Sequence, residues 1–64
     1  MKKDLIKYLA MDSAEALLFT AALLTDGIWF EAEPWPEDCW AIYCKQDAKH
    51  VTDAIAKATL TEVQ

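Results

Sequence analysis

The chain has 64 residues, which is enough for one small domain and no more. Hydrophobic residues make up 55% of it, and only one glycine and two prolines are present, a composition that excludes an intrinsically disordered chain. Eleven acidic residues against six lysines give a formal net charge of −5, which argues against direct binding to nucleic acid or to an anionic membrane surface.

The N-terminal part of the chain, residues 1–26, is predicted to be helical. Within residues 2–10 the apolar side chains of Leu5, Ile6 and Leu9 fall on one helical face, which predicts a short first helix. The sequence leaves open whether this segment is separate from the helix that follows.

A longer helix is predicted from Ser13 to Asp26. Asp12 is placed to accept hydrogen bonds from first-turn amides and Glu15 to reach back as in a capping box, while Gly27 stands at the expected C-terminal cap. Apolar side chains surround this helix, and one stripe consists of Leu17, Leu18, Ala21 and Leu24. Such a helix is usually buried on most sides, which in a chain this small favours dimerisation.

A β-hairpin is predicted over residues 27–45. Alternating side chains indicate one strand at 28–33 and a second at 39–45, and the loop at 34–38 follows because two prolines cannot both occupy a ladder. The core face of the hairpin is expected to carry four large apolar side chains, namely Ile28, Phe30, Trp40 and Ile42.

A C-terminal helix is predicted over residues 47–60, with Asp47 as its N-cap and Asp53 paired with Lys57 one turn later. The tail, residues 61–64, is expected either to fray or to add a short edge strand. The whole chain is therefore predicted to form a single two-layer α+β domain in the order α-β-β-α, with the helices on one face of an antiparallel hairpin.

Acidic side chains are concentrated on the predicted hairpin. No basic residue lies between Lys7 and Lys45, and four of the acids in that interval belong to the hairpin, namely Glu31, Glu33, Glu37 and Asp38. Carboxylates two residues apart on a strand are separated by about 6.6 Å, which loosely imitates the spaced charges of a phosphate backbone. These four residues are predicted to attract a basic surface on a partner; the alternative is a solvated face that keeps the protein soluble.

Three aromatic residues are predicted to help hold that partner. Trp29 falls on the outer face of the hairpin with Tyr43 opposite or nearby, and Trp35 lies between two prolines at the tip of the loop. Trp and Tyr are favoured anchors of protein interfaces. The alternative is that Trp29 and Tyr43 are covered by residues 2–10 or by a second copy of the chain.

No catalytic, metal or cofactor site is predicted. His50 is the only histidine, and nothing in the sequence brings it against Cys39 or Cys44 together with an orienting acid. The same three side chains lack the paired short spacings of a tetrahedral metal site. The two cysteines would lie roughly 16 Å apart along one strand, too far for a disulfide, so we expect reduced thiols and a cytoplasmic protein that is not an enzyme.

In size, negative charge and absence of a recognised catalytic motif, the chain resembles the small acidic inhibitors encoded by bacteriophages, including anti-CRISPR proteins that block a DNA-binding surface. The likeness covers no sequence motif. It implies a DNA mimic that inhibits a protein by occupying its basic nucleic-acid-binding surface, without itself contacting nucleic acid or membrane. The alternative is a homodimeric regulatory domain that buries Trp29 and Tyr43 between two hairpins and senses a small molecule.

Overall fold

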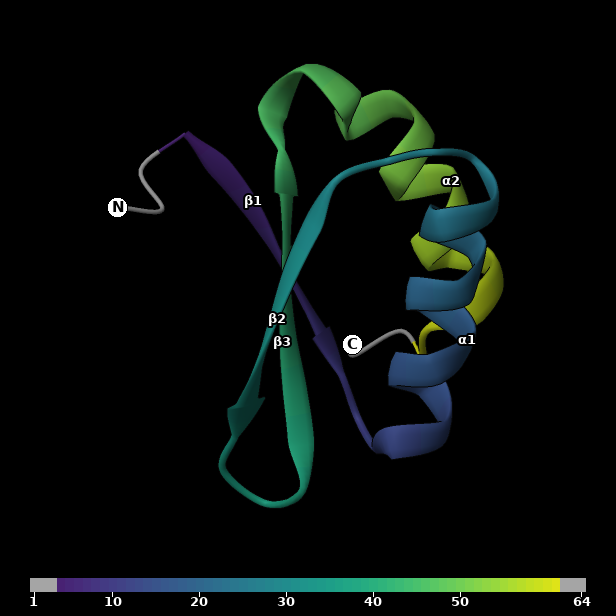
Figure 1. Cartoon of the computed structure of the whole chain (residues 1–64). Coiled ribbons are helices and arrows are strands. Elements are labelled where there is room, and N and C mark those ends of the chain that lie inside the picture. Colours follow the sequence, from purple (N-terminus) through teal and green to yellow (C-terminus); the bar gives the residue numbers. More distant parts are fainter. Residues whose placement is uncertain (1–3, 62–64) are drawn as a thin grey trace.

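The computed structural model describes residues 4–61, which form three strands and two helices. In chain order the elements are β1 (Leu5–Ala10), α1 (Ser13–Thr25), β2 (Phe30–Trp35), β3 (Cys39–Lys45), the 3₁₀ turn η1 (Gln46–Ala48) and α2 (Lys49–Thr59). Both helices lie on the same side of the sheet (Figure 1). The α+β class is confirmed, but the predicted order α-β-β-α is wrong, because the described residues run β-α-β-β-α.

The segment predicted as a first helix is strand β1, so the N-terminal part of the chain is not wholly helical. The apolar face of Leu5, Ile6 and Leu9 suits a helix. The same residues also fit a strand, in which Ile6 and Tyr8 point to one side and Lys7 to the other. A helix this short has little stability of its own, whereas β1 gains a ladder of backbone bonds with β3. Tertiary pairing therefore decides the structure of this segment.

β3 is the central strand of an antiparallel sheet, paired with β1 on one side and β2 on the other. Ile42 is fully buried between the sheet and the helices, and Ile28, Phe30 and Trp40 pack against the same core. The predicted core face of the hairpin is confirmed. Buried side chains from the other elements complete the core, namely Ala10, Phe19, Leu23 and Cys44.

β2 continues through Pro34 and Trp35, which were predicted to lie in a loop. Pro34 is tolerated because β2 is an edge strand, on which a residue without an N–H can face the unpaired side. The loop is thereby reduced to residues 36–38, in which Glu37 and Asp38 adopt positive φ angles of 65° and 63°. The predicted loop was therefore two residues too long.

α1 is capped at both ends by the residues predicted for that role. The Asp12 carboxylate accepts a 2.9 Å hydrogen bond from the backbone N–H of Glu15. The Glu15 carboxylate does not complete a capping box, because it accepts instead from the backbone N–H of Thr61. At the other end Gly27 has a φ of 68°, and the backbone bonds donated by Gly27 and Ile28 close a Schellman motif.

α2 begins at Lys49, after η1, and no side chain caps it. The prediction of Asp47 as its N-cap is wrong, because Asp47 lies within η1. Asp53 forms an ion pair with Lys49 one turn earlier rather than with Lys57. Of the tail whose structure the sequence left open, residues 62–64 lie outside the described residues.

Tyr8 fastens α2 to the sheet. Its hydroxyl donates to the Asp53 carboxylate at 2.6 Å and lies 2.7 Å from the hydroxyl of Thr52. Thr52 is fully buried and is also within hydrogen-bonding distance of two carbonyl oxygens of the preceding turn. β1 and α2, at opposite ends of the chain, are thus joined by side-chain hydrogen bonds as well as by the core.

Candidate protein-binding surface

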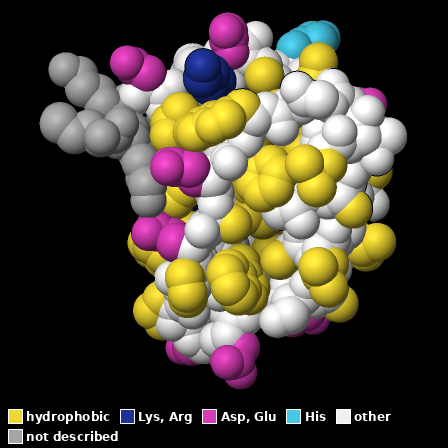
Figure 2. Space-filling view, viewed as in Figure 1, with side chains coloured by type: hydrophobic (Ala, Val, Ile, Leu, Met, Phe, Trp, Pro, Cys, Tyr) yellow, Lys and Arg dark blue, Asp and Glu magenta, His cyan; other side chains and the backbone are white. Residues whose placement is uncertain are grey.

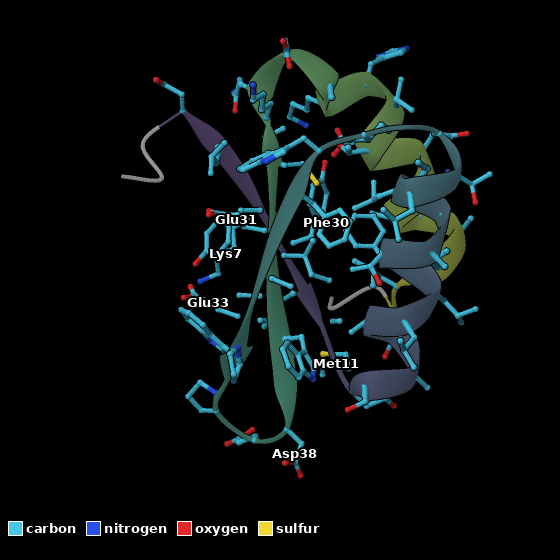
Figure 3. All side chains as sticks on the ribbon, viewed as in Figure 1. Lys7, Met11, Phe30, Glu31, Glu33 and Asp38 are labelled. Carbon is cyan, nitrogen blue, oxygen red and sulfur yellow. The ribbon has the colours of Figure 1, made fainter. Side chains whose placement is uncertain are left out.

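The face of the sheet that carries no helix, which we call the open face, holds four of the seven residues predicted to bind a partner. Glu31, Glu33 and Trp35 alternate along β2, and Tyr43 lies on β3 opposite Glu31. Figure 3 shows Glu31 and Glu33 pointing away from the helices, whereas Phe30 points toward them. Strand pairing brings these acids and aromatic residues to one surface.

The open face carries both signs of charge, because β1 and β3 add Lys7 and Lys45 to it. The Lys7 ammonium lies 3.8 Å from the centre of the Trp35 ring, and the Lys45 ammonium lies 5.7 Å from that of Trp29. Both distances suit a cation–π interaction. The predicted acidic surface therefore includes two lysines. The alternation of β3 places Lys45 on the face of Tyr43, and the alternation of β1 would have revealed Lys7 had that segment been interpreted as a strand.

The three predicted aromatic anchors differ in exposure. Tyr43 is only 8% exposed, and its hydroxyl donates a 2.7 Å hydrogen bond to the Glu33 carboxylate. Trp29 and Trp35 remain exposed. The two tryptophans can therefore offer contact area to a partner, while Tyr43 mainly positions Glu33.

The hairpin turn and the start of α1 border an acidic cleft of about 730 Å³. Glu37 and Asp38 line it from the turn, and Asp12 lines it from the residue that caps α1. Figure 3 shows Asp38 at the tip of the hairpin. No basic side chain of the described residues lines this cleft, so its charged lining is wholly negative.

The apolar stripe predicted on α1 faces solvent. Leu17, Leu18 and Leu24 are 69%, 60% and 69% exposed, while Phe19 and Leu23 on the other side of the helix fill the core. Monomeric proteins seldom gather several exposed leucines on one helix side without a functional reason. The sequence predicted the stripe but not that residues 4–61 would leave it uncovered.

An apolar groove of about 360 Å³ runs between α1 and the free edge of β2. Its walls come from both elements and its floor from β3, the principal side chains being Ala16, Leu17, Thr20, Phe30, Ala32 and Trp40. Figure 2 shows hydrophobic side chains gathered on this side of the molecule. The sequence interpretation missed the groove, because the edge position of β2 follows only once β1 occupies the other side of β3.

The titratable groups outside this surface serve the fold. Burial raises the pKa of the Cys44 thiol to about 11, which makes it a poor nucleophile. Burial and the hydrogen bond to Asp53 raise the pKa of the Tyr8 hydroxyl to about 12, and hydrogen bonds from Lys49 and Tyr8 lower the pKa of Asp53. His50 is exposed on the first turn of α2. Residues 4–61 contain no group of three or more His, Cys, Asp or Glu side chains placed to hold a metal ion.

Neither of the two described helices combines the length and the apolar content that crossing a bilayer requires. Comparison of the chain with protein-family models, with curated proteins and with solved structures found no match. Inference about function therefore rests on the surfaces of the chain itself.

Proposed function

We propose that the chain is a small protein-binding domain whose partner presents a basic and partly apolar surface. The observation that carries the proposal is the solvent exposure of Leu17, Leu18 and Leu24 on one side of α1. Complete burial of a leucine side chain contributes roughly 1.5–3 kcal/mol, so a partner that covers this stripe gains several kcal/mol toward association.

The charge distribution supports a basic partner. The elements beside the leucine stripe, from α1 through the hairpin turn, contain no basic residue and carry the acids Glu15, Asp26, Glu31, Glu33, Glu37 and Asp38. Opposite charge on the partner would speed association at low ionic strength. The buried free thiols of Cys39 and Cys44 support a reducing compartment such as the cytoplasm.

A more specific version is an inhibitor that occupies a nucleic-acid-binding surface, as a DNA mimic does. It is favoured by the outward-facing carboxylates of Glu31, Glu37 and Asp38 beside the exposed rings of Trp29 and Trp35. Lys7 and Lys45 weaken it, because they break the uniform negative charge of the open face. Release of bound nucleic acid from a captured partner when the chain is added would support this version, and retention would count against it.

The test is affinity capture from an extract of the source organism with the wild-type chain and matched variants, at low and high salt. Leu18→Gln together with Leu24→Gln should lose the partner at both salt concentrations, because apolar contact resists screening. Glu37→Gln together with Asp38→Asn should weaken capture at low salt only. Val51→Gln removes an exposed apolar side chain from α2 instead and should capture normally.

Capture that survives the double leucine substitution, in a variant whose circular dichroism matches the wild type, would overturn the proposal. A wild-type dimer at micromolar concentration that becomes a monomer in the same variant would instead assign the stripe to a homodimer contact. In that case the alternative of a homodimeric regulatory domain would replace the proposed function.

A further inference from the structure

We propose that the free edge of β2 binds an extended peptide in which apolar and basic residues alternate, by adding it to the antiparallel sheet as a further antiparallel strand. This inference rests on the proposed function and deepens it, since it names the chemistry of the partner segment. Three features meet at this edge: unpaired backbone groups, the apolar groove and acidic side chains on the opposite face. Strand addition uses all three at once.

The backbone groups of Phe30 and Ala32 point to the unpaired side of β2. Alternate residues of a strand direct their N–H and C=O groups to the same neighbour, so residues 30, 32 and 34 share one direction. Pro34 lacks an N–H, and proline within an edge strand occupies the positions whose amide would face solvent. No strand formed by residues 4–61 pairs with this side of β2. Two donors and three acceptors are thus directed at an incoming strand.

Every second side chain of the added strand would enter the apolar groove. The side chains of Phe30 and Ala32 face the helices, and residues opposite them in a new ladder would face the same way. Leu17 and Thr20 form the facing wall on α1, with Trp40 as the floor. Because no charged side chain lines this groove, it favours apolar residues such as valine at these positions.

The intervening side chains of the added strand would lie on the open face beside the acids of β2. Glu31 carries most of this argument, since Glu33 already accepts a hydrogen bond from Tyr43. The lysines of the open face, Lys7 and Lys45, belong to β1 and β3 and not to this edge. Lysine or arginine opposite Glu31 would form a cross-strand pair of opposite charge. At the other end of β2 the acidic cleft would receive a further basic side chain.

A second copy of the chain is a poorer occupant of this edge. If two β2 strands paired antiparallel about Ala32, Glu31 of one copy would lie opposite Glu33 of the other, and like charges directly opposite one another destabilise a ladder. Pro34 would also offer no donor to the second strand. Acidic side chains and proline on an exposed edge are common protections against self-association.

The probe is a capped heptapeptide of alternating lysine and valine, titrated into ¹⁵N-labelled protein and followed by NMR. Binding should shift the amides of Phe30 and Ala32 and slow their hydrogen exchange at least tenfold, while the amides of β1 stay unchanged. A block isomer with the same composition should bind at least tenfold more weakly, because its valines cannot alternate into the groove.

Protein variants separate the backbone contribution from the charge contribution. Ala32→Pro removes an N–H that faces solvent and should abolish binding in a folded protein, whereas Ala32→Val keeps the N–H and should bind within threefold of wild type. Glu31→Lys should weaken binding at least tenfold. Asp4→Lys makes the same change of net charge next to β1, on the other side of β3, and should alter binding less than threefold.

Methylated peptides test the backbone geometry of strand addition without changing the protein. This test remains valid even if Ala32→Pro does not fold. Valines that enter the groove turn their backbone N–H groups toward β2, so methylating the backbone nitrogens of the valines should abolish binding. Methylating the backbone nitrogens of the lysines, which face away from β2, should leave the affinity within threefold of that of the unmethylated peptide. Equal effects of the two methylations would overturn strand addition.

Two further outcomes would also overturn the proposal. Equal binding of the alternating peptide and the block isomer, with shifts spread over the acids, would show attraction between charges only. Concentration-dependent shifts of the Phe30 and Ala32 amides without peptide would assign the edge to a second copy. If either occurred while capture of the natural partner still depended on Leu18 and Leu24, the peptide-binding site would be refuted and the proposed function would be retained.

Discussion

The two helices cover the same face of the sheet but use their surfaces in opposite ways. α2 buries Thr52 against Tyr8 and turns Lys49, Asp53 and Lys57 to solvent. α1 buries Phe19 and Leu23 and turns leucines to solvent on the opposite side. One helix therefore separates apolar from polar side chains, and the other is apolar nearly all round.

Within the described fold, the outer side of α2 is suited to contact with water, whereas the outer side of α1 is not. The charged outer side of α2 suits water, and its charges include the Lys49–Asp53 ion pair. The outer side of α1 leaves apolar surface exposed, although a chain of this size has little core material to spare. Contact with something beyond residues 4–61 is the simplest use for that surface, and only α1 borders the β2 groove.

The largest effect that tests this comparison is expected within α1 itself. Phe19→Ala should lower the free energy of unfolding by about 3–5 kcal/mol, because it leaves a cavity in the core, and most of a small domain's stability would be lost. Leu18→Ala, one residue away on the exposed side, should change it by less than about 1 kcal/mol. Urea unfolding followed by circular dichroism measures both. Equal losses would show that Leu18 is covered in solution.

The sequence was sufficient to predict the elements with strong local signals. α1 between Asp12 and Gly27 and strand β3 were placed correctly, because caps, a positive-φ glycine and a continuous apolar run are recorded in neighbouring residues. β1 could not be recognised in the same way, since its helical and strand patterns are both acceptable. The missing information was that β3 pairs along both of its edges, so that a second strand lies beside it.

The candidate site was predictable only where it depends on local sequence patterns. Alternation along β2 placed Glu31 and Glu33 together on the correct face of the sheet. Lys7 reaches that face only through the pairing of β1 with β3, which joins residues far apart in the chain. The groove depends on the same pairing, because it leaves β2 as an edge strand beside α1. Local pattern thus predicted the acids, and long-range topology decided what surrounds them.

An intermediate effect is expected at the anchor of α2, and it depends on pH. Tyr8→Phe should lower the free energy of unfolding by about 1–2 kcal/mol at neutral pH, through loss of the hydrogen bonds to Asp53 and Thr52. In the wild type the pKa of Tyr8 is raised from 10.0 to about 12 and that of Cys44 from 9.0 to about 11. The unfolded chain therefore releases these protons first, so the stability that these two groups contribute is fully present below pH 9 and falls as the pH rises to 12.

The variant Tyr8→Phe should also show a smaller alkaline loss than the wild type, and its remaining loss should follow the titration of Cys44. Urea unfolding at pH 8, 10 and 12 compares the two proteins. Leu18→Ala is a suitable control, because it leaves both ionisable groups in place and should keep the wild-type pH dependence. An identical alkaline loss in the wild type and in Tyr8→Phe would show that the Tyr8 proton is not held by the fold.

The smallest effect is expected at the ends of the two helices. α1 ends in a Schellman motif that needs Gly27 at a φ of 68°, whereas α2 ends where Leu60 takes an extended conformation that any residue adopts. A Cβ atom at Gly27 would meet nothing within 4 Å. Gly27→Ala should therefore lower the free energy of unfolding only through the strain of a positive φ, by about 1 kcal/mol. Gly27→Asn should cost less, because Asn tolerates positive φ. Equal losses for Ala and Asn would mean that the positive φ of Gly27 does not set the loss of stability at this position.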